Sequence, residues 1–317
     1  NNNTRRRHNL FHSIMKIGST DITNPRIGTT PINKVFIGLD KVWPNVVDEF
    51  IFKINTNLGS GASFKYNPGT SGVVNYTIDY GDGTVINYTT SGLKTHTYSS
   101  GGIYIIKILY TSGVLRYNFY QYDANKIIEV INWGTYSGLN SMFRSFRLCT
   151  NLTTISATDY PDLTNVISFN EMFVGCTSLV FPSSISSWDV SNVQDFTSCF
   201  RLSLFDIDIS SWNLSSATTI NRIVKDTPFN QPIGAWSIPN VTSVFNSFLN
   251  SNLDNTNYQN GIIGWTGWTS GAPTKTLKSN VSAHFGTAKY EIGGESEDVR
   301  NYLTGTLGWT ITDGGGI

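Results

Sequence analysis

The feature that most constrains this chain is an internal repeat of 24 to 27 residues between about Trp133 and Leu253. Three apolar columns share the spacings 27, 27, 24 and 24, and a fourth column places tryptophans 24 residues apart. The columns are Leu139, Val166, Val193, Ala217 and Val241; Met142, Phe169, Phe196, Ile220 and Val244; Phe146, Phe173, Phe200, Val224 and Phe248; and Trp188, Trp212 and Trp236. Repeats of this length stack their equivalent apolar positions into one continuous core. We therefore expect a binding or structural protein and not an enzyme.

Within each repeat the columns fall at i, i+3 and i+7, which predicts one face of a short helical segment. Short runs such as Ser184–Ser187 and Asp208–Ser211 precede the tryptophans and are predicted to be extended. The prediction is a leucine-rich-repeat-like solenoid over residues 123–255, with one strand and one helical turn per repeat. The repeat core is expected to hold Phe146, Phe173, Phe200, Phe248, Trp188, Trp212 and Trp236.

The repeats resemble the BspA-like leucine-rich-repeat surface proteins over about 130 residues. The resemblance is carried by Met172–Leu179 and Ser187–Val193, with weaker copies at Ser211–Ala217 and Ala235–Val241. It implies an adhesive surface protein.

Residues 49–122 are predicted to form a small β-sandwich, because Phe50, Phe52 and Ile54 alternate with other residues in the period of a strand. The segments Tyr80–Thr84, His96–Tyr98 and Gly102–Ile106 resemble the polycystic-kidney-disease (PKD) type of immunoglobulin-like domain. Tyr80 stands where that family usually has Trp. His96 is expected to have a structural role in this motif.

Residues 1–48 are expected to be an extended docking arm, since their short apolar pieces bury too little surface to fold alone. The segment Ile27–Pro44 resembles one found near the start of many phage tail and minor structural proteins. The arm's predicted contacts are Arg5, Arg6, Arg7, Ile27, Val35 and Trp43. Residues 256–317 are expected to cap the repeats, with helices at Tyr258–Trp265 and Glu295–Leu303.

Composition excludes several classes of protein. The chain has 22 basic and 22 acidic residues, so we expect no nucleic-acid binding, which needs a basic surface. Its apolar runs are too short for a membrane span, and the first 15 residues do not predict a signal peptide. Cys149, Cys176 and Cys199 lie 27 and 23 residues apart, which predicts small buried core residues and not a metal site.

Catalytic chemistry is not indicated by any motif, and no cofactor is expected. Asp189, Asp195, Asp206 and Asp208 are scattered among Ser and Asn, as in ordinary turns. Asp79 and Asp82 are weak calcium candidates, because Ca²⁺ prefers carboxylate oxygens. The tryptophan column is either core or, as the less favoured alternative, a stacking ladder for sugar rings.

The sequence therefore predicts a non-enzymatic virion structural protein of a tailed bacteriophage, such as a head or tail fibre, decoration protein or adhesin. Its arm would bind other virion proteins of the capsid or tail, and its exposed Ser, Thr and Asn side chains would contact a host surface glycan or protein. A homo-oligomer is left open. The alternatives are a bacterial cell-surface adhesin and a carbohydrate-binding module.

Overall fold

The computed structural model describes residues 48–59, 61–68, 73–114 and 116–317, together with four short strands between residues 26 and 43. The chain divides into two compact units, Asn1–Val47 and Asp48–Ile317. The three segments predicted after residue 48 lie within the second unit. The fold is mainly β with a few short helices, as predicted.

In the first unit, β1 (Arg26–Ile27) pairs with β2 (Thr30–Pro31), and β3 (Val35–Ile37) pairs with β4 (Asp40–Trp43), both antiparallel. Val35 is the strand partner of Trp43. Arg5, Arg6 and Arg7 lie outside the described residues. The docking role predicted for all of these positions stays a prediction.

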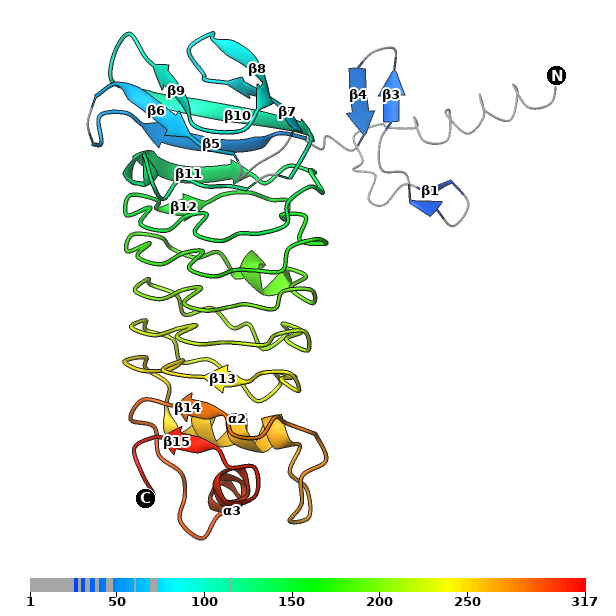
Figure 1. Cartoon of the computed structure of the whole chain (residues 1–317), viewed down its shortest axis with the longest axis vertical. Coiled ribbons are helices and arrows are strands. Elements are labelled where there is room, and N and C mark those ends of the chain that lie inside the picture. Colours follow the sequence, from blue (N-terminus) through cyan, green and yellow to red (C-terminus); the bar gives the residue numbers. More distant parts are fainter. Residues whose placement is uncertain are drawn as a thin grey trace, which may run out of the picture. The chain divides into compact units, whose positions relative to one another are not determined.

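The second unit opens with a six-stranded sheet in the order β12-β11-β5-β10-β7-β8 (Figure 1). Its strands are β5 (Phe50–Asn55), β7 (Val73–Asp79), β8 (Val85–Thr90), β10 (Ile103–Ser112), β11 (Ile127–Asn132) and β12 (Thr154–Ile155). Alternate side chains of β5 and β7 are buried, which confirms the strands predicted from the period-2 pattern. A separate pair, β6 (Ser63–Tyr66) and β9 (Lys94–Thr97), packs Phe64 against Phe52 of β5, with ring centroids 5.7 Å apart.

The sheet continues directly into the repeats. Strand β5 pairs with β10 on one side and with β11 on the other, and β11 then pairs in parallel with β12. A short 3₁₀-helix, η1 (Ala124–Lys126), leads into β11. Hydrogen bonding therefore crosses the predicted boundary between residues 122 and 123 without a break.

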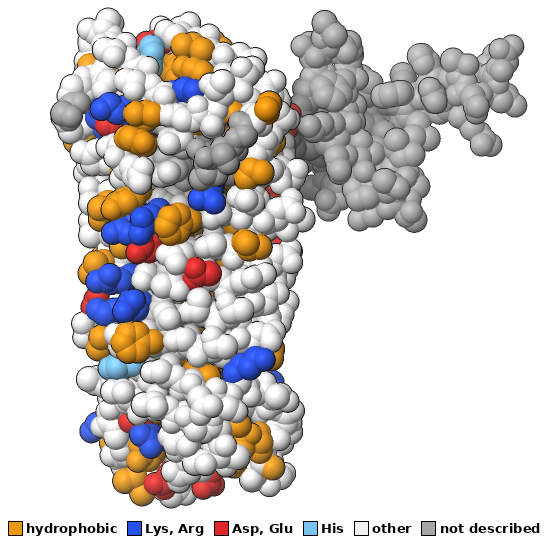
Figure 2. Space-filling model, in the orientation of Figure 1, with side chains coloured by type: hydrophobic (Ala, Val, Ile, Leu, Met, Phe, Trp, Pro, Cys, Tyr) orange, Lys and Arg blue, Asp and Glu red, His pale blue; other side chains and the backbone are white. Residues whose placement is uncertain are grey.

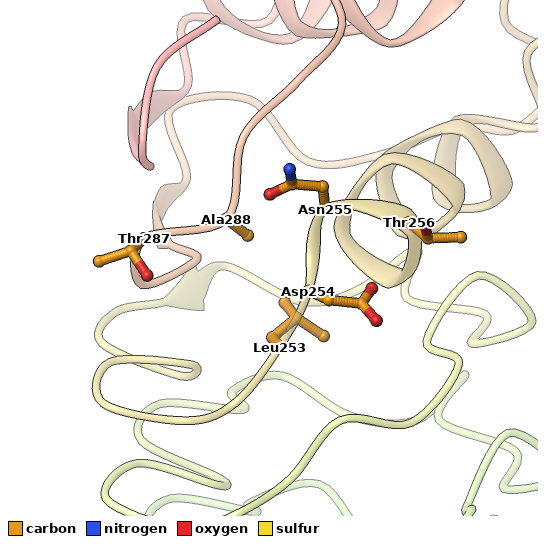
Figure 3. Close-up of a pocket in the computed structure, with 6 residues that line it drawn as sticks. All are labelled: Leu253, Asp254, Asn255, Thr256, Thr287 and Ala288. Atoms are coloured by element: carbon orange, nitrogen blue, oxygen red, sulfur yellow. The ribbon is translucent and has the colours of Figure 1, made fainter. Parts of the chain in front are cut away.

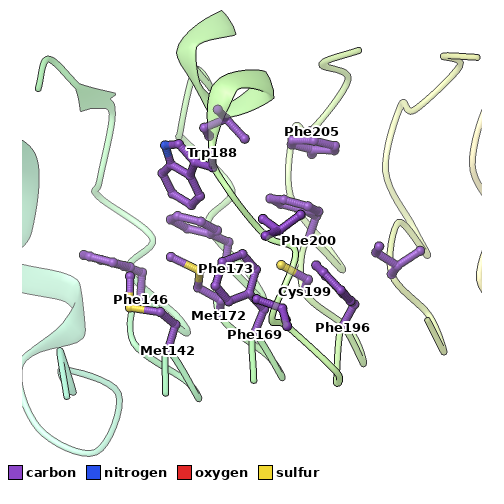
Figure 4. Close-up of a cluster of buried hydrophobic side chains, with 14 of the residues drawn as sticks. Met142, Phe146, Phe169, Met172, Phe173, Trp188, Phe196, Cys199, Phe200 and Phe205 are labelled. Atoms are coloured by element: carbon purple, nitrogen blue, oxygen red, sulfur yellow. The ribbon is translucent and has the colours of Figure 1, made fainter. Parts of the chain in front are cut away.

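From β12 onward the chain forms stacked coils joined by parallel bridges. Single bridges join Ser168 to Asp195, Asp195 to Thr219 and Thr219 to Ser243. Inside the stack, phenylalanine rings form a column from Phe146 to Phe285, with successive centroids 3.6 to 6.4 Å apart. Figure 4 shows its first part, from Phe146 to Phe205. The aromatic core thus runs through every coil and into the C-terminal segment.

The helical turn predicted for each repeat is wrong. Residues 143–148 and their equivalents form turns in which Arg144, Leu148, Glu171, Ser198 and Leu202 have left-handed φ values of 55° to 59°. Such residues cannot continue a right-handed helix, although i, i+3 and i+7 still point inward. Ser184–Ser187, predicted to be extended, instead belongs to the 3₁₀-helix η2 (Ser183–Ser187).

The C-terminal segment continues the ladder of bridges. Strand β13 (Ser243–Val244) pairs in parallel with β14 (Ser282–His284), and β14 pairs with β15 (Thr310–Thr312). Helix α2 (Asn255–Thr266) and helix α3 (Glu295–Asn301), which runs into the π-helix η3 (Tyr302–Thr306), confirm the two predicted helices. Among the described residues, no helix has the length and apolar character needed to cross a membrane.

Candidate ligand-binding face

Five equivalent turns bring one set of side chains to the same face of the stacked coils. They are residues 143–148, 170–175, 197–202, 221–226 and 245–250, and we call their exposed and partly exposed side chains the turn face. In the first four turns every second amide donates to the next coil, as Arg144 N does to Asn170 O (3.0 Å) and Leu148 N to Val174 O (2.8 Å). This backbone ladder fixes the turns in register, so equivalent side chains of neighbouring coils lie in line.

The turn face holds all the positive charge of the repeats. Between residues 137 and 253 the only Lys and Arg residues are Arg144, Arg147, Arg201, Arg222 and Lys225, and all five lie in these turns. The turns contain two acidic residues, Glu171 and Asp226. Figure 2 shows Lys and Arg side chains gathered along one edge of the stack beside hydrophobic ones. One face of an otherwise neutral chain is therefore basic.

At the first two turns, a pair of arginines converges on one carboxylate. Arg144 Nε donates to Glu171 Oε2 (2.5 Å), and Arg147 donates to the same oxygen. Both guanidinium groups also lie over the ring of Tyr120, at 5.4 and 4.4 Å from its centroid. Arg144 additionally lies 4.6 Å from the centroid of Phe143. These contacts hold the guanidinium groups in fixed planes.

Further along the face the pattern recurs in weaker form. Lys225 donates to Asp226 Oδ2 (2.6 Å), and Arg201 Nε lies 3.6 Å from the same oxygen. Burial alone would raise the pKa of Asp226, but hydrogen bonds from Lys225 and Asn250 outweigh it and lower that pKa. Arg222 lies 5.3 Å from the ring centroid of Phe245, whose side chain is exposed.

A cleft of about 290 Å³ opens where the six-stranded sheet meets the first turn. Its lining side chains are two arginines, two aromatic rings and three amides: Arg116, Arg144, Tyr120, Phe143, Asn67, Asn118 and Gln121. Arg116 Nε is buried and donates to no acceptor among the described residues. We call this the junction cleft.

A second hollow, of about 430 Å³, lies at the start of α2 (Figure 3). Asp254 and Asn255 line it, with Thr287 and Ala288 on the opposite loop. Asp254 caps the helix by accepting from Asn257 N (2.8 Å), and Asn255 Oδ1 accepts from Lys289 N (2.8 Å). Because these polar groups already have protein partners, the hollow is a weaker candidate than the junction cleft.

The seven predicted repeat-core residues are all buried, with at most 4% of any side chain exposed. The indole Nε1 of Trp212 donates to Ile185 O (3.0 Å), and that of Trp236 donates to Ile209 O (3.1 Å), each in the preceding coil. The tryptophans therefore join successive coils, and their rings do not face solvent, where sugars would stack.

The two calcium candidates, Asp79 and Asp82, have partners within the protein. Asp82 accepts from His96 Nε2 (2.7 Å) and from Thr84 N, and Asp79 accepts from Gly81 N. Gly81 has a φ of +78°, and a Cβ there would lie 2.5 Å from Ile105 O, so this turn requires glycine. Across the described ranges, no three His, Cys, Asp or Glu side chains gather as a metal site would require.

Three of the four scattered carboxylates accept a hydrogen bond within their own turn, and Asp206 accepts from Asn230 N in the next coil. Asp189 accepts from Ser191 N (3.1 Å) and Asp208 from Ser210 N (2.8 Å), both two residues ahead in the chain. The three cysteines are free and buried, as predicted.

Residues 137–261 match a protein family described as Mycoplasma protein of unknown function, DUF285. The match covers most of the stacked coils and less than half of the chain. No curated protein and no solved structure matches the chain.

The sequence analysis did not predict the basic character of the turn face. It predicted ligand contact by exposed Ser, Thr and Asn side chains. The signal was present, because all five cations of the repeats lie within six residues after the Met142, Phe169, Phe196 and Ile220 column. The net charge of the whole chain does not reveal this local cluster of cations, because it sums to zero. Arg116 carried no comparable signal, because its position beside the first turn depends on the fold.

Proposed function

We propose that this chain is a non-enzymatic structural protein of a tailed-phage particle. It is attached through residues 1–48 and presents its stacked coils to a polymer on the host surface. The observation that carries the attachment is the resemblance of Ile27–Pro44 to the early segment of phage tail and minor structural proteins. The observation that carries the binding role is the turn face, a fixed array of arginine and aromatic side chains.

The finer fold assignments belong to the same proposal. The sheet with its β6–β9 partner is proposed to be a PKD-type immunoglobulin-like sandwich, on the strength of the Tyr80–Thr84 turn and of Phe64 packed on Phe52. The coils are proposed to be a leucine-rich-repeat-like solenoid, which the recurring core columns and coil-to-coil hydrogen bonds support. In chain order the proposed sandwich follows the attachment segment and precedes the coils.

A rigid ladder suits binding better than catalysis. Catalytic groups need a nucleophile or acid/base pair within hydrogen-bond reach of substrate. Asp189, Asp254 and Asp226 instead serve in a turn, a helix cap and an ion pair, respectively.

The second candidate is a bacterial cell-surface adhesin. Two observations support it, namely the BspA-like motifs at Met172–Leu179 and Ser187–Val193 and the match to a family described from a bacterium. The same coils would then present the turn face to a host or a neighbouring cell.

The test is deletion of residues 1–48 in a phage that carries the gene, followed by purification of particles and mass spectrometry. We expect the truncated protein to be missing from particles while remaining folded by circular dichroism. The full chain with Arg222→Gln is the control, because Arg222 lies in the coils, and it should be incorporated normally. Truncated protein at full copy number in the particles would contradict the proposed attachment.

A further inference from the structure

We propose that the junction cleft and the adjoining turn face bind an anionic polysaccharide, whose carboxylate or sulfate group is held by Arg116 and Arg144. This deepens the proposed function and rests on it for the identity of the polymer as a host surface component. The chemistry of the site itself depends on Asn67 and on residues between 116 and 144, and not on residues 1–48.

Arg116 is the first reason for an anionic ligand. Its Nε is buried, and no described residue accepts a hydrogen bond from it or forms an ion pair with it. Arg116 as a whole is only partly buried, so an anion in the cleft can reach the terminal N–H groups of this guanidinium, which has no carboxylate partner. Arg presents its N–H groups as a planar fork that matches carboxylate and sulfate oxygens.

Arg144 is the second reason. Within the described residues its guanidinium uses only Nε, which donates to Glu171. Its terminal nitrogens carry four further N–H groups. The rings of Tyr120 and Phe143 fix the plane of the group at the wall of the cleft. Glu171 does not cancel this positive charge, because Arg144 and Arg147 share that one carboxylate.

The remaining lining favours a sugar over an acidic protein. Asn118 and Gln121 bring amides that both donate to and accept from hydroxyl groups, and Tyr120 and Phe143 add apolar ring surface. The cleft's 290 Å³ is close to the lower end of small-ligand pockets. A stable protein partner would need roughly 1,000 Å² of complementary surface. The cleft therefore suits one or two charged sugar rings.

The turn face extends this site along the coils, as a polymer requires. Arg147 and Arg201 each share one carboxylate with a second cation, and Arg222 has an aromatic contact and no described ion pair. Arg147, Arg201 and Lys225 occupy equivalent positions in one column, and Arg144 and Arg222 occupy equivalent positions in the neighbouring column. A chain of charged sugars anchored in the cleft can therefore continue along this face.

The test is isothermal titration calorimetry of the full chain with short acidic oligosaccharides, namely oligogalacturonate, alginate oligomers and sulfated dextran. Methyl-esterified oligogalacturonate is the matched neutral ligand. We expect at least one acidic oligomer to bind, its ester to bind at least about tenfold more weakly, and affinity to fall with added salt. Arg116→Gln should weaken binding at least about tenfold, and Arg116→Lys should weaken it less.

Two further variants keep the test decisive. Lys107→Gln removes the same charge from β10, outside the cleft lining, and should leave affinity unchanged within about twofold. Gln121→Glu adds a carboxylate at an exposed cleft position, so the variant should fold normally and lose acidic ligands, even if Arg116→Gln fails to fold.

Equal losses in Arg116→Gln and Lys107→Gln would overturn the proposal, because they would show unspecific attraction. No binding to any acidic oligomer, or tighter binding to polyglutamate than to every oligosaccharide, would also overturn it, the latter in favour of an acidic protein partner. The outcome is separable from the attachment test. Residues 1–48 can fail to attach the chain to particles while the purified protein still binds acidic oligosaccharides. Equally, the chain can be attached to particles through residues 1–48 and bind none of these ligands.

Discussion

In the C-terminal segment, Arg300 of α3 donates through Nε to Oδ2 of Asp313, over 2.8 Å. Tyr258 of α2 donates its hydroxyl to the same oxygen, over 2.7 Å. The Asp313 side chain is only 3% exposed. One carboxylate, directly after β15, thus joins both helices of the cap, and Tyr258 in turn packs against Phe285 at the end of the aromatic column.

Asp313→Ala is therefore expected to destabilise the protein by about 3 kcal/mol, because it leaves a partly buried guanidinium without its partner. Urea unfolding followed by tryptophan fluorescence measures this loss. Asp298→Ala, at an exposed position of α3, is the control and should change stability by less than about 0.5 kcal/mol. Equal losses in the two variants would show that Asp313 does not join the cap.

The same carboxylate predicts a loss of stability in acid. Burial alone would raise the pKa of Asp313, but the hydrogen bonds from Arg300 and Tyr258 outweigh it and hold that pKa below its ordinary value of 3.8. A folded-state pKa below the unfolded one stabilises the fold above pH 3.8, and this contribution disappears as pH falls through the folded value. As pH falls from about 6 to about 3, the urea concentration at the midpoint of unfolding should fall more steeply for the natural chain than for Asp313→Asn. Parallel curves would contradict this account.

The aromatic column predicts a second, larger effect. Phe200 is fully buried, and its ring stacks on Phe205 with centroids 3.6 Å apart. Phe200→Ala should cost roughly 3–5 kcal/mol through lost contacts and the cavity that remains. Leu202→Ala, two residues on and 43% exposed, should cost less than about 0.5 kcal/mol. Chemical denaturation of both variants tests whether the column holds neighbouring coils together.

The three cysteines should be unreactive in the folded protein. Burial raises the pKa of Cys149 and Cys199 well above the ordinary value of 9.0, and it raises that of Cys176 as well. Since the thiolate is the reactive form, a thiol-specific dye should label none of them in native buffer and all three in denaturant. Fast labelling of the native protein would show that the coils open locally.

The periodic parts of the fold could be predicted from the sequence. The columns through Phe146 and Trp188 were visible because a stacked core requires equivalent residues at equivalent positions, and alternation identified strands such as β5 and β7. The helix wrongly predicted after Met142 shows the limit of periodicity. A turn with left-handed residues at Arg144 and Leu148 buries the same i, i+3 and i+7 positions as a helix does.

The candidate site was predictable only in part. The basic column of the turn face is encoded in the repeat register, whereas the junction cleft brings Arg116 and Arg144 together from two different modules. That proximity follows from the pairing of β5 with both β10 and β11, a long-range arrangement that local patterns do not specify.

The most direct test of the whole account is an electron-microscopy map of the phage particle that carries this protein. We predict density for the sheet and stacked coils projecting from the particle, with residues 1–48 contacting a capsid or tail protein and the turn face open to solvent. Absence of the chain from the particle would contradict the account. Burial of the turn face against other virion proteins would equally contradict its proposed role in host contact.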